Sequence, residues 1–378
     1  VEAFRRIVRY EWYKSKQPLT FEKLRNILKN QIAGIELNEE AARITAFSLY
    51  LSLLHYLDPP AIDQRIKRGN KLPNLVVSRC RSDNHFHCIL PGNAFDAPLI
   101  ESDPYLQERF GEACADIVIG NPPWGSPGPK ADSETKRHHE KLIDWCASKK
   151  NPIGDEEPSQ AFLWRALYSL KEKGNAGMLV STGVLFKHNT TSLDFRQSWL
   201  SRVKLSEVFN FSHARNFFFK GTIAPFLFIS FSKENQGDNP VYYWSAKQAA
   251  NIKKTQAIVF SRYDLNVLHA GDLTETSIWK ELWFGRPADR EFLRLLRRYP
   301  RIGQLCNRID SGQGFKESSK TTDADILQNF KYLDIDSFSR YDSLAFLLPP
   351  KKVERLGILS VYEGHRLLVK RGIQQKTV

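Results

Sequence analysis

The chain has 378 residues, of which 42% are apolar and 26% charged, and its formal net charge is +13. This length is enough for two domains, and the composition is that of a globular protein. No run approaches 18 apolar residues and no signal-peptide pattern opens the chain, so a membrane span and export are not expected. The positive charge favours a polyanionic partner, nucleic acid first; the alternative is a solubility charge without a partner.

The cysteines indicate a reducing compartment. Their number is odd, their spacing is irregular and no pair forms a Cys-x-x-Cys motif, which argues against a zinc site or a disulfide framework. We therefore expect a cytoplasmic protein without a bound metal. The five positions are Cys80, Cys88, Cys114, Cys146 and Cys306.

The N-terminal region reads as helices around a short strand. Apolar spacing predicts helices over residues 1–14 and 19–30, and the first has no preceding cap, so we expect a segment upstream of Val1. Residues 31–37 read as a buried strand with Glu36 near its end. Residues 38–54 form a strong helix pattern with Asn38 as N-cap, which Pro59-Pro60 should stop.

The middle of the chain alternates strands and helices. We expect an irregular basic surface segment over 63–84 and a long mobile insertion over 125–158. The remaining pattern predicts an α/β fold with a mainly parallel sheet, in which one late strand runs antiparallel. Strands are predicted at 85–90, 115–119, 177–183, 206–211, 224–231 and, at an edge, 240–245; helices are predicted at 159–171, closed by Lys173-Gly174, and at 192–203.

The C-terminal third has a different sequence pattern, without the alternation of strands and helices. Residues 273–298 read as helical, with a basic cluster that includes Arg290, Arg294, Arg297 and Arg298. We divide the chain at residues 247 and 300, which gives a catalytic domain (1–247), a helical connector (248–300) and the start of a further domain (301–378).

One stretch stands out: the predicted strand 115–119 runs into Gly120-Asn121-Pro122-Pro123-Trp124. Proline fixes φ and pushes the preceding residue out of the helical region, so Asn121 is held extended at the carboxyl end of a strand. Ligands of open α/β sheets bind at that edge. The alternative is an ordinary Pro-Pro turn after a core strand, with Trp124 as a core aromatic.

This motif, with its neighbours, resembles the amino-group DNA methyltransferases, whose signature is (Asp/Asn)-Pro-Pro-(Tyr/Phe/Trp). The match is closest to the gamma type, adenine-specific, of fused restriction–modification enzymes and phage-defence methylases. The stretches that resemble family motifs are 32–44, 90–95, 115–125, 174–185 and 217–226; residues 310–316 and 366–372 resemble the start of a target-recognition domain.

The resemblance implies a Rossmann-like fold that uses S-adenosylmethionine to methylate the 6-amino group of adenine in duplex DNA, with restriction or defence subunits as further partners. It implies a catalytic role for Asn121, Pro122, Pro123 and Trp124, and base stacking by Trp124 and Phe219. Cofactor contacts fall on Glu36, Leu37, Asn93, Ala94 and Asn121. The family's first motif, a Gly-rich turn after a strand, is absent, so we expect it upstream of Val1 in a longer protein.

Other interpretations remain open. Glu36 could be a surface or capping acid, Asn93 a turn residue, and Phe219 part of a core run of phenylalanines. At the level of function, the alternatives are an RNA or protein-glutamine amino-methyltransferase, which shares the motif, and an inactive DNA-binding remnant. His138 and His139 lack a partner at metal-ligand spacing, and no P-loop or nuclease motif is present.

Overall fold

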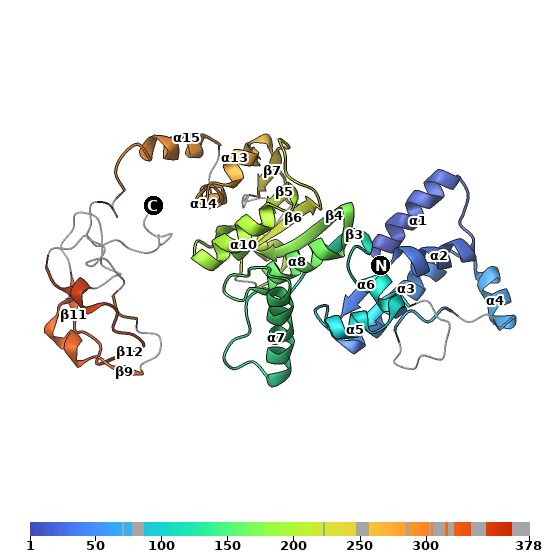
Figure 1. Cartoon of the computed structure of the whole chain (residues 1–378), viewed down its shortest axis with the longest axis horizontal. Coiled ribbons are helices and arrows are strands. Elements are labelled where there is room, and N and C mark those ends of the chain that lie inside the picture. Colours follow the sequence, from blue (N-terminus) through green and yellow to red (C-terminus); the bar gives the residue numbers. More distant parts are fainter. Residues whose placement is uncertain are drawn as a thin grey trace. The chain divides into compact units, whose positions relative to one another are not determined.

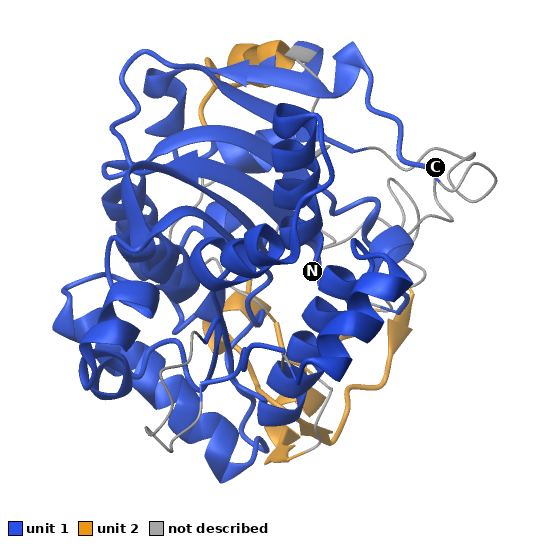
Figure 2. Cartoon of the chain, turned by 90° about the vertical axis from the view of Figure 1, so that its right-hand side faces the viewer, with its two compact units in different colours: residues 1–290 blue, residues 291–378 orange. Residues whose placement is uncertain are grey.

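The computed structural model describes residues 1–69, 72–77, 87–221, 224–246, 257–284, 287–301, 304, 314–316, 321–333 and 345–364. Contacts divide the chain into two compact units, residues 1–290 and 291–378 (Figure 2). The domain limits expected at 247 and 300 stay predictions. Within the described residues, no helix is both long and apolar enough to cross a membrane.

The first unit is built on a six-stranded mixed sheet (Figure 1). Four strands share one direction, whereas β6 and β8 run opposite to their neighbours. The strands lie in the order β3 (Ala115–Gly120), β4 (Leu170–Ser181), β6 (Phe226–Ser232), β5 (Lys204–Asn210), β7 (Val241–Ser245) and β8 (Leu265–Leu268). The α/β prediction is therefore confirmed. The sheet is mixed and not mainly parallel, because two strands, and not the single one expected, run antiparallel. Strand β7 is not at the edge, because the short β8 pairs outside it.

Helices cover one face of this sheet. Alternate strand residues such as Met178, Val208 and Tyr243 are buried there, as expected for a period of two. Trp199 meets Phe231 edge-to-face with ring centroids 5.0 Å apart. The covering helices are α8 (Pro158–Ser169), α10 (Thr190–Leu200) and α14 (Ile278–Phe284).

The opposite face carries exposed apolar side chains. Ile117 and Ile119 of β3 are 71% and 68% exposed, and their neighbour Val118, which points the other way, packs into the core. Among the described residues, β3 pairs with β4 alone. Parallel strands are normally covered on both faces, so β3 is an unusually open strand.

The N-terminal part packs helices around a separate two-stranded ladder. The ladder is parallel and aligns Glu36 with Pro91. Phe4, Leu24 and Leu49 are fully buried and join the first three helices. The elements are α1 (Glu2–Ser15), α2 (Phe21–Gln31), β1 (Gly34–Glu36), α3 (Glu39–Leu54), α4 (Pro59–Lys67), β2 (Ile89–Pro91), α5 (Ala97–Glu101) and α6 (Pro104–Phe110).

Three local predictions were wrong, and one predicted strand is shorter than expected. Pro59-Pro60 opens α4 instead of only stopping α3, because proline suits the first helical positions, and the predicted irregular segment therefore begins as a helix. The predicted mobile insertion contains α7 (Ser133–Ser148), which Asp132 caps. Lys173-Gly174 does not close a helix but lies within β4. The strand predicted at 85–90 is β2, and residues 85–86 lie outside the described residues.

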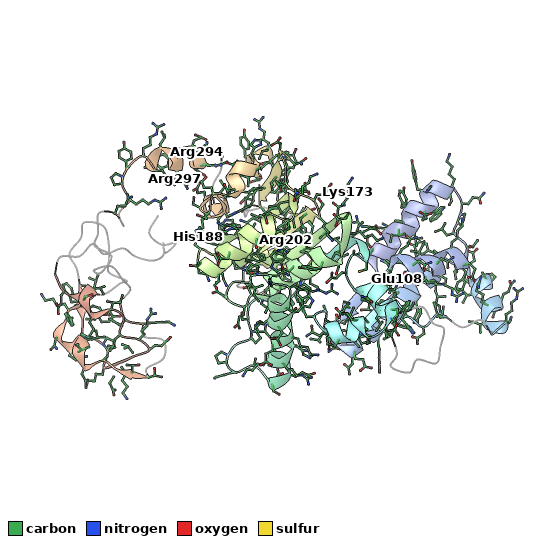
Figure 3. The ribbon with its side chains drawn as sticks, viewed as in Figure 1. Glu108, Lys173, His188, Arg202, Arg294 and Arg297 are labelled. Atoms are coloured by element: carbon green, nitrogen blue, oxygen red, sulfur yellow. The ribbon has the colours of Figure 1, made fainter. Side chains whose placement is uncertain are left out.

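The helical pattern predicted over 273–298 resolves into separate helices. They are α14 and α15 (Pro287–Leu296), and a short helix, α13 (Ala270–Leu273), ends where the predicted range begins. Arg294 lies on α15 and Arg297 follows it (Figure 3). Two short helices of the first unit, α9 (Gly183–Phe186) and α11 (Arg215–Phe218), lie in loops after β4 and β5.

The second unit has small antiparallel ladders and a small core of Ala324, Leu327 and Val353. Residues 310–313 and 366–372, which resemble parts of a target-recognition domain, lie outside the described residues. The ladders pair β9 (Thr322–Asp323) with β12 (Lys352–Val353) and β10 (Tyr332–Leu333) with β11 (Phe346–Leu347).

Candidate functional site

The Asn-Pro-Pro-Trp turn leaves the carboxyl end of β3, as the sequence predicts. Asn121 is exposed, Pro122 is buried and Trp124 is half-buried. Trp124 Nε1 donates to the carbonyl oxygen of Leu179 on β4 at 3.1 Å, which ties the indole to the neighbouring strand. The turn therefore presents the Asn121 side chain from a backbone that is fixed on both sides.

Aromatic rings gather beside this turn. Phe226 stacks on Trp124 with centroids 5.2 Å apart and planes 23° apart. Phe219, which follows α11, meets Trp124 edge-to-face at 5.9 Å and 85°. The structure thus brings Trp124 and Phe219 together, although 95 positions of chain separate them. Phe226, which the sequence analysis missed, lies against both rings.

The turn is anchored by residues that the sequence analysis did not identify. Gly125 adopts a φ of 80°, which favours glycine, and its backbone N–H donates to Glu157 Oε1 at 2.9 Å. Ser159 Oγ lies 3.5 Å from the carbonyl oxygen of Pro123. In sequence, an acid before Pro158 reads only as a helix N-cap, so nothing local marks Glu157 as a partner of the turn.

Glu36 and Leu37 lie at the carboxyl edge of the β1–β2 ladder. The Glu36 carbonyl oxygen accepts from the Gly92 N–H at 2.9 Å, so β1 and the turn after β2 lie side by side. One carboxylate oxygen of Glu36 accepts from the Asn38 N–H at 2.9 Å. The Leu37 side chain is exposed. An acid at such an edge can accept hydrogen bonds from sugar hydroxyls.

Asn93 is 8% exposed and its amide group is engaged in shaping the loop. Its Oδ1 accepts from the Phe95 N–H at 2.9 Å, and its Nδ2 donates to the His138 carbonyl oxygen on α7 at 3.2 Å. The Ala94 carbonyl oxygen accepts from Arg165 Nε at 2.8 Å. Asn93 and Ala94 therefore connect the loop after β2 to the helices that follow β3.

Arg165 of α8 also links these regions. It is buried, and besides Ala94 it donates to the carbonyl oxygens of Phe110 and Gly111 and to Ser169 Oγ. Burial lowers the pKa of its guanidinium. The predicted site residues thus form two groups, one on the β1–β2 ladder and one on the six-stranded sheet, and Arg165 ties the connecting loops together.

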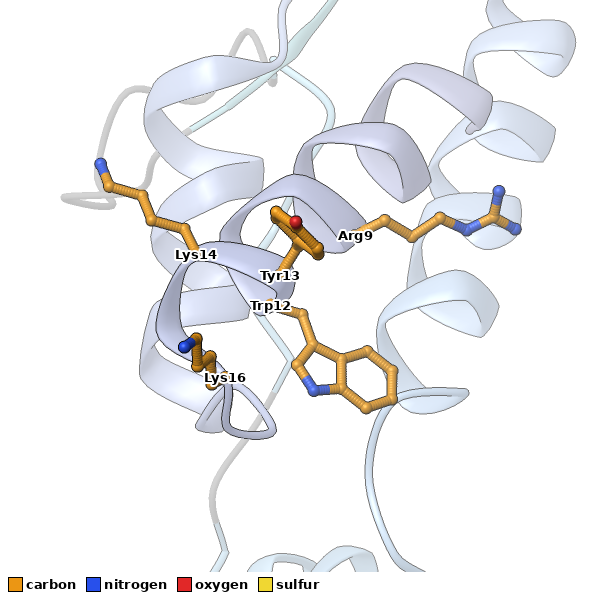
Figure 4. Close-up of a pocket in the computed structure, with 5 residues that line it drawn as sticks. All are labelled: Arg9, Trp12, Tyr13, Lys14 and Lys16. Atoms are coloured by element: carbon orange, nitrogen blue, oxygen red, sulfur yellow. The ribbon is translucent and has the colours of Figure 1, made fainter.

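A separate hollow of about 600 Å³ lies on α1, lined by basic and aromatic side chains (Figure 4). It contains none of the predicted site residues. Within the part of the chain that the structure describes, no group of three or more His, Cys, Asp or Glu side chains is placed to hold a metal ion. The lining residues are Arg9, Trp12, Tyr13, Lys14 and Lys16.

Solved structures, among them two subunits of type I restriction enzymes, are similar to this chain. The M protein of the type I restriction enzyme EcoKI is 16% identical, covers 63% of this chain and 40% of its own, and gives a TM-score of 0.39. A modification subunit of a putative type I restriction enzyme from Vibrio vulnificus YJ016 is 14% identical, with 68% and 47% covered and a TM-score of 0.39. DrdV, in a DNA complex, is 14% identical, with 66% and 25% covered and a TM-score of 0.44.

The chain spans about half or less of the length of the solved structures that it matches. A comparison with curated proteins gave no match. The model of one family, described as the Eco57I restriction-modification methylase, matches residues 30–218, which is half of the chain and includes both groups of predicted site residues apart from Phe219. The chain therefore belongs to the Eco57I restriction-modification methylase family.

Proposed function

We propose that this protein transfers a methyl group from S-adenosylmethionine to the 6-amino group of adenine in duplex DNA, as a gamma-type methylase of a restriction–modification or phage-defence system. The observation that carries the proposal is the position of Asn121 at the end of β3, in the same turn as Trp124, whose ring meets that of Phe219. The net charge of +13 supports a DNA partner, because phosphate contacts supply much of the affinity for DNA.

The chemistry follows from two fixed acceptors. The lone pair of an exocyclic amino group is delocalised into the ring, so the amine is a poor nucleophile. The side-chain carbonyl of Asn121 and the backbone carbonyl of Pro122 can accept its two N–H groups and favour a more tetrahedral nitrogen. Because prolines hold these acceptors in place, orientation lowers the barrier.

The target base must leave the duplex to reach Asn121. Trp124 and Phe219 provide aromatic surface for the extruded base, and such stacking contributes about 1–3 kcal/mol per base. Phe226 already covers part of the indole and fixes its tilt. We assign base stacking to Trp124 and Phe219, with Phe226 as their support.

The residues of the β1–β2 edge fit part of the methyl donor. Glu36 has one carboxylate oxygen on the Asn38 N–H, and the other can accept from ribose hydroxyls. Leu37 offers exposed apolar surface beside it. Asn93 would shape the adjoining loop through Phe95 and His138. When bound, S-adenosylmethionine supplies an electrophilic methyl group.

We further propose that a strand with a Gly-rich turn, from a segment outside residues 1–378, completes the donor site by pairing with β3. The support for this is that, among the described residues, β3 pairs with β4 alone, so its other edge has free backbone groups for a further strand. Calorimetry should then find tighter S-adenosylmethionine binding to a longer protein that includes the upstream segment than to residues 1–378. Equal affinity would contradict the proposed strand.

The catalytic proposal is tested by Asn121→Ala in the full-length protein. We expect loss of DNA methylation, measured by transfer of labelled methyl groups, with cofactor affinity nearly unchanged in calorimetry. Asn175→Ala is the matched control, because that residue is also exposed but lies within β4. Mass spectrometry of digested DNA should identify N6-methyladenine.

Three outcomes would contradict the proposal in different ways. Unchanged turnover of Asn121→Ala removes the catalytic assignment. Detection of N4-methylcytosine removes adenine as the target. Retention of DNA on a filter without any cofactor cross-linking indicates an inactive DNA-binding protein instead.

A further inference from the structure

Glu157 is a buried acid in direct contact with the backbone that follows Trp124. It is 4% exposed, and its Oε1 accepts from the Gly125 N–H at 2.9 Å and from Ser181 Oγ at 3.2 Å. Glu157 is also the N-cap residue of α8, but its side chain makes no capping hydrogen bond to that helix. The carboxylate is therefore directed at the turn and not at its own helix.

The two residues that precede Glu157 have strained backbone conformations and are hydrogen-bonded to the residue after Gly125. Asp155 and Glu156 have φ angles of 53° and 51°, which are uncommon for residues other than glycine. Ser126 Oγ donates to the carbonyl oxygens of both residues, at 2.8 and 3.1 Å. Backbone strain of this kind persists where surrounding contacts enforce it and is enriched at functional sites.

The buried charge of Glu157 has a cationic partner. Lys187, which follows α9, lies 3.6 Å from Glu157 Oε2 and 2.9 Å from Asp155 Oδ2. Asn189 Nδ2 also donates to Asp155 Oδ1 at 2.7 Å. A buried carboxylate needs such compensation, because desolvation disfavours an unpaired charge.

We propose that Glu157 is a positioning residue that fixes the Asn121–Gly125 turn for the reaction. It acts through the Gly125 N–H on one side and Ser181 of β4 on the other, so the turn that presents Asn121 and Trp124 is held against the sheet. This inference rests on the proposed function for its catalytic consequence, but its structural part stands without it.

The structural part is tested by amide hydrogen exchange with single-residue resolution. In Glu157→Ala of the full-length protein, the Gly125 amide should exchange faster, because it loses its acceptor. Glu156→Ala is the matched control: that side chain is exposed and lies 3.6 Å from His139, so the Gly125 amide should stay protected. Unchanged protection of Gly125 in Glu157→Ala overturns the proposal.

The catalytic part is tested by steady-state kinetics of the same variants. A turn displaced by about 1 Å can reduce the rate roughly 100-fold. We expect a kcat reduction of that order in Glu157→Ala with an unchanged KM for S-adenosylmethionine. Glu157→Gln should recover most of kcat, since its amide oxygen can still accept from the Gly125 N–H. A glutamine variant as impaired as the alanine variant overturns the positioning role.

Two results would leave the kinetic test unusable, and each has a replacement measurement. If circular dichroism shows that Glu157→Ala does not fold, Ser181→Ala replaces it, because it removes a hydrogen bond that orients the carboxylate; no change in Gly125 exchange there overturns the proposal. If the unaltered protein transfers no methyl group, the proposed function fails, whereas hydrogen exchange still decides whether Glu157 holds the turn.

Discussion

Two buried thiols make the stability of the fold decrease at alkaline pH. Cys88 and Cys146 are almost completely buried, and burial raises the pKa of Cys88 to about 11 and that of Cys146 to about 12. In an unfolded chain, a thiol ionises near pH 8.5. The raised pKa values therefore stabilise the fold below about pH 8.5, and this stabilisation is lost as the pH rises toward 11 and 12.

We expect the free energy of unfolding to fall as the pH rises above about 9, by up to about 1.4 kcal/mol per pH unit for each thiol. Urea titrations between pH 7 and 10.5 measure it. A Cys88→Ala and Cys146→Ala double variant will be less stable at pH 7, because it leaves cavities, but its stability should fall less steeply with pH. Parallel curves for the two proteins would contradict this prediction.

At the residue scale, the sequence could locate the turn but not its supports. The neighbours of Asn121 in the chain are themselves prolines and a tryptophan, so their conformational effect is local and readable. Glu157 and Phe226 reach the turn only through the packing of strands that are distant in sequence. The engagement of Asn93 by His138 likewise depends on where α7 lies.

The helix α3 shows how a local signal sets an element. Asn38 Oδ1 accepts from the Ala41 N–H at 2.9 Å, which satisfies one of the free N–H groups of the first turn. Glu39 and Glu40 follow, where negative charge complements the helix dipole. The helix then begins at the residue that the sequence predicts.

Asn38→Ala should lower the free energy of unfolding by about 1 kcal/mol, because it removes the N-cap acceptor. Urea denaturation followed by circular dichroism measures the change. Asn38→Ser is the matched control, since a serine hydroxyl can accept the same hydrogen bond, and it should cost much less. Equal losses in both variants would show that capping is not the cause.

Elements with strong periodicity or caps could be predicted, whereas those set by tertiary pairing could not. Helices α1 to α3 and strand β3 follow their patterns closely. Helix α7 was not predicted because its N-terminal half is polar, and the apolar residues that it buries, which include Leu142 and Trp145, lie only in its C-terminal half. Strand β4 begins before Gly174 because Leu170 already pairs with Ala115 of β3, and beyond a shift in register β3 and β6 both pair with β4 from Asn175 onward, which local propensity does not encode.

At the scale of the whole molecule, the sheet is asymmetric. Helices bury one face, and the other leaves Ile117 and Ile119 of the outermost strand exposed. Alternation along each strand could be read from the sequence. That Ile117 and Ile119 have no cover among the described residues could not, because the same apolar residues would be buried if another layer packed on them.

The edge of strand β3 that is unpaired among the described residues also favours self-association of the protein. A flat, apolar edge strand is a template on which a second molecule can add its own strand. A protein consisting of residues 1–378 should therefore self-associate as its concentration rises, and Ile117→Lys should reduce this by placing a charge on the edge. Sedimentation velocity over a concentration series measures the effect. Ile66→Lys is the matched control, because Ile66 is 70% exposed but lies on a helix. Equal self-association of the two variants would show that β3 does not mediate it.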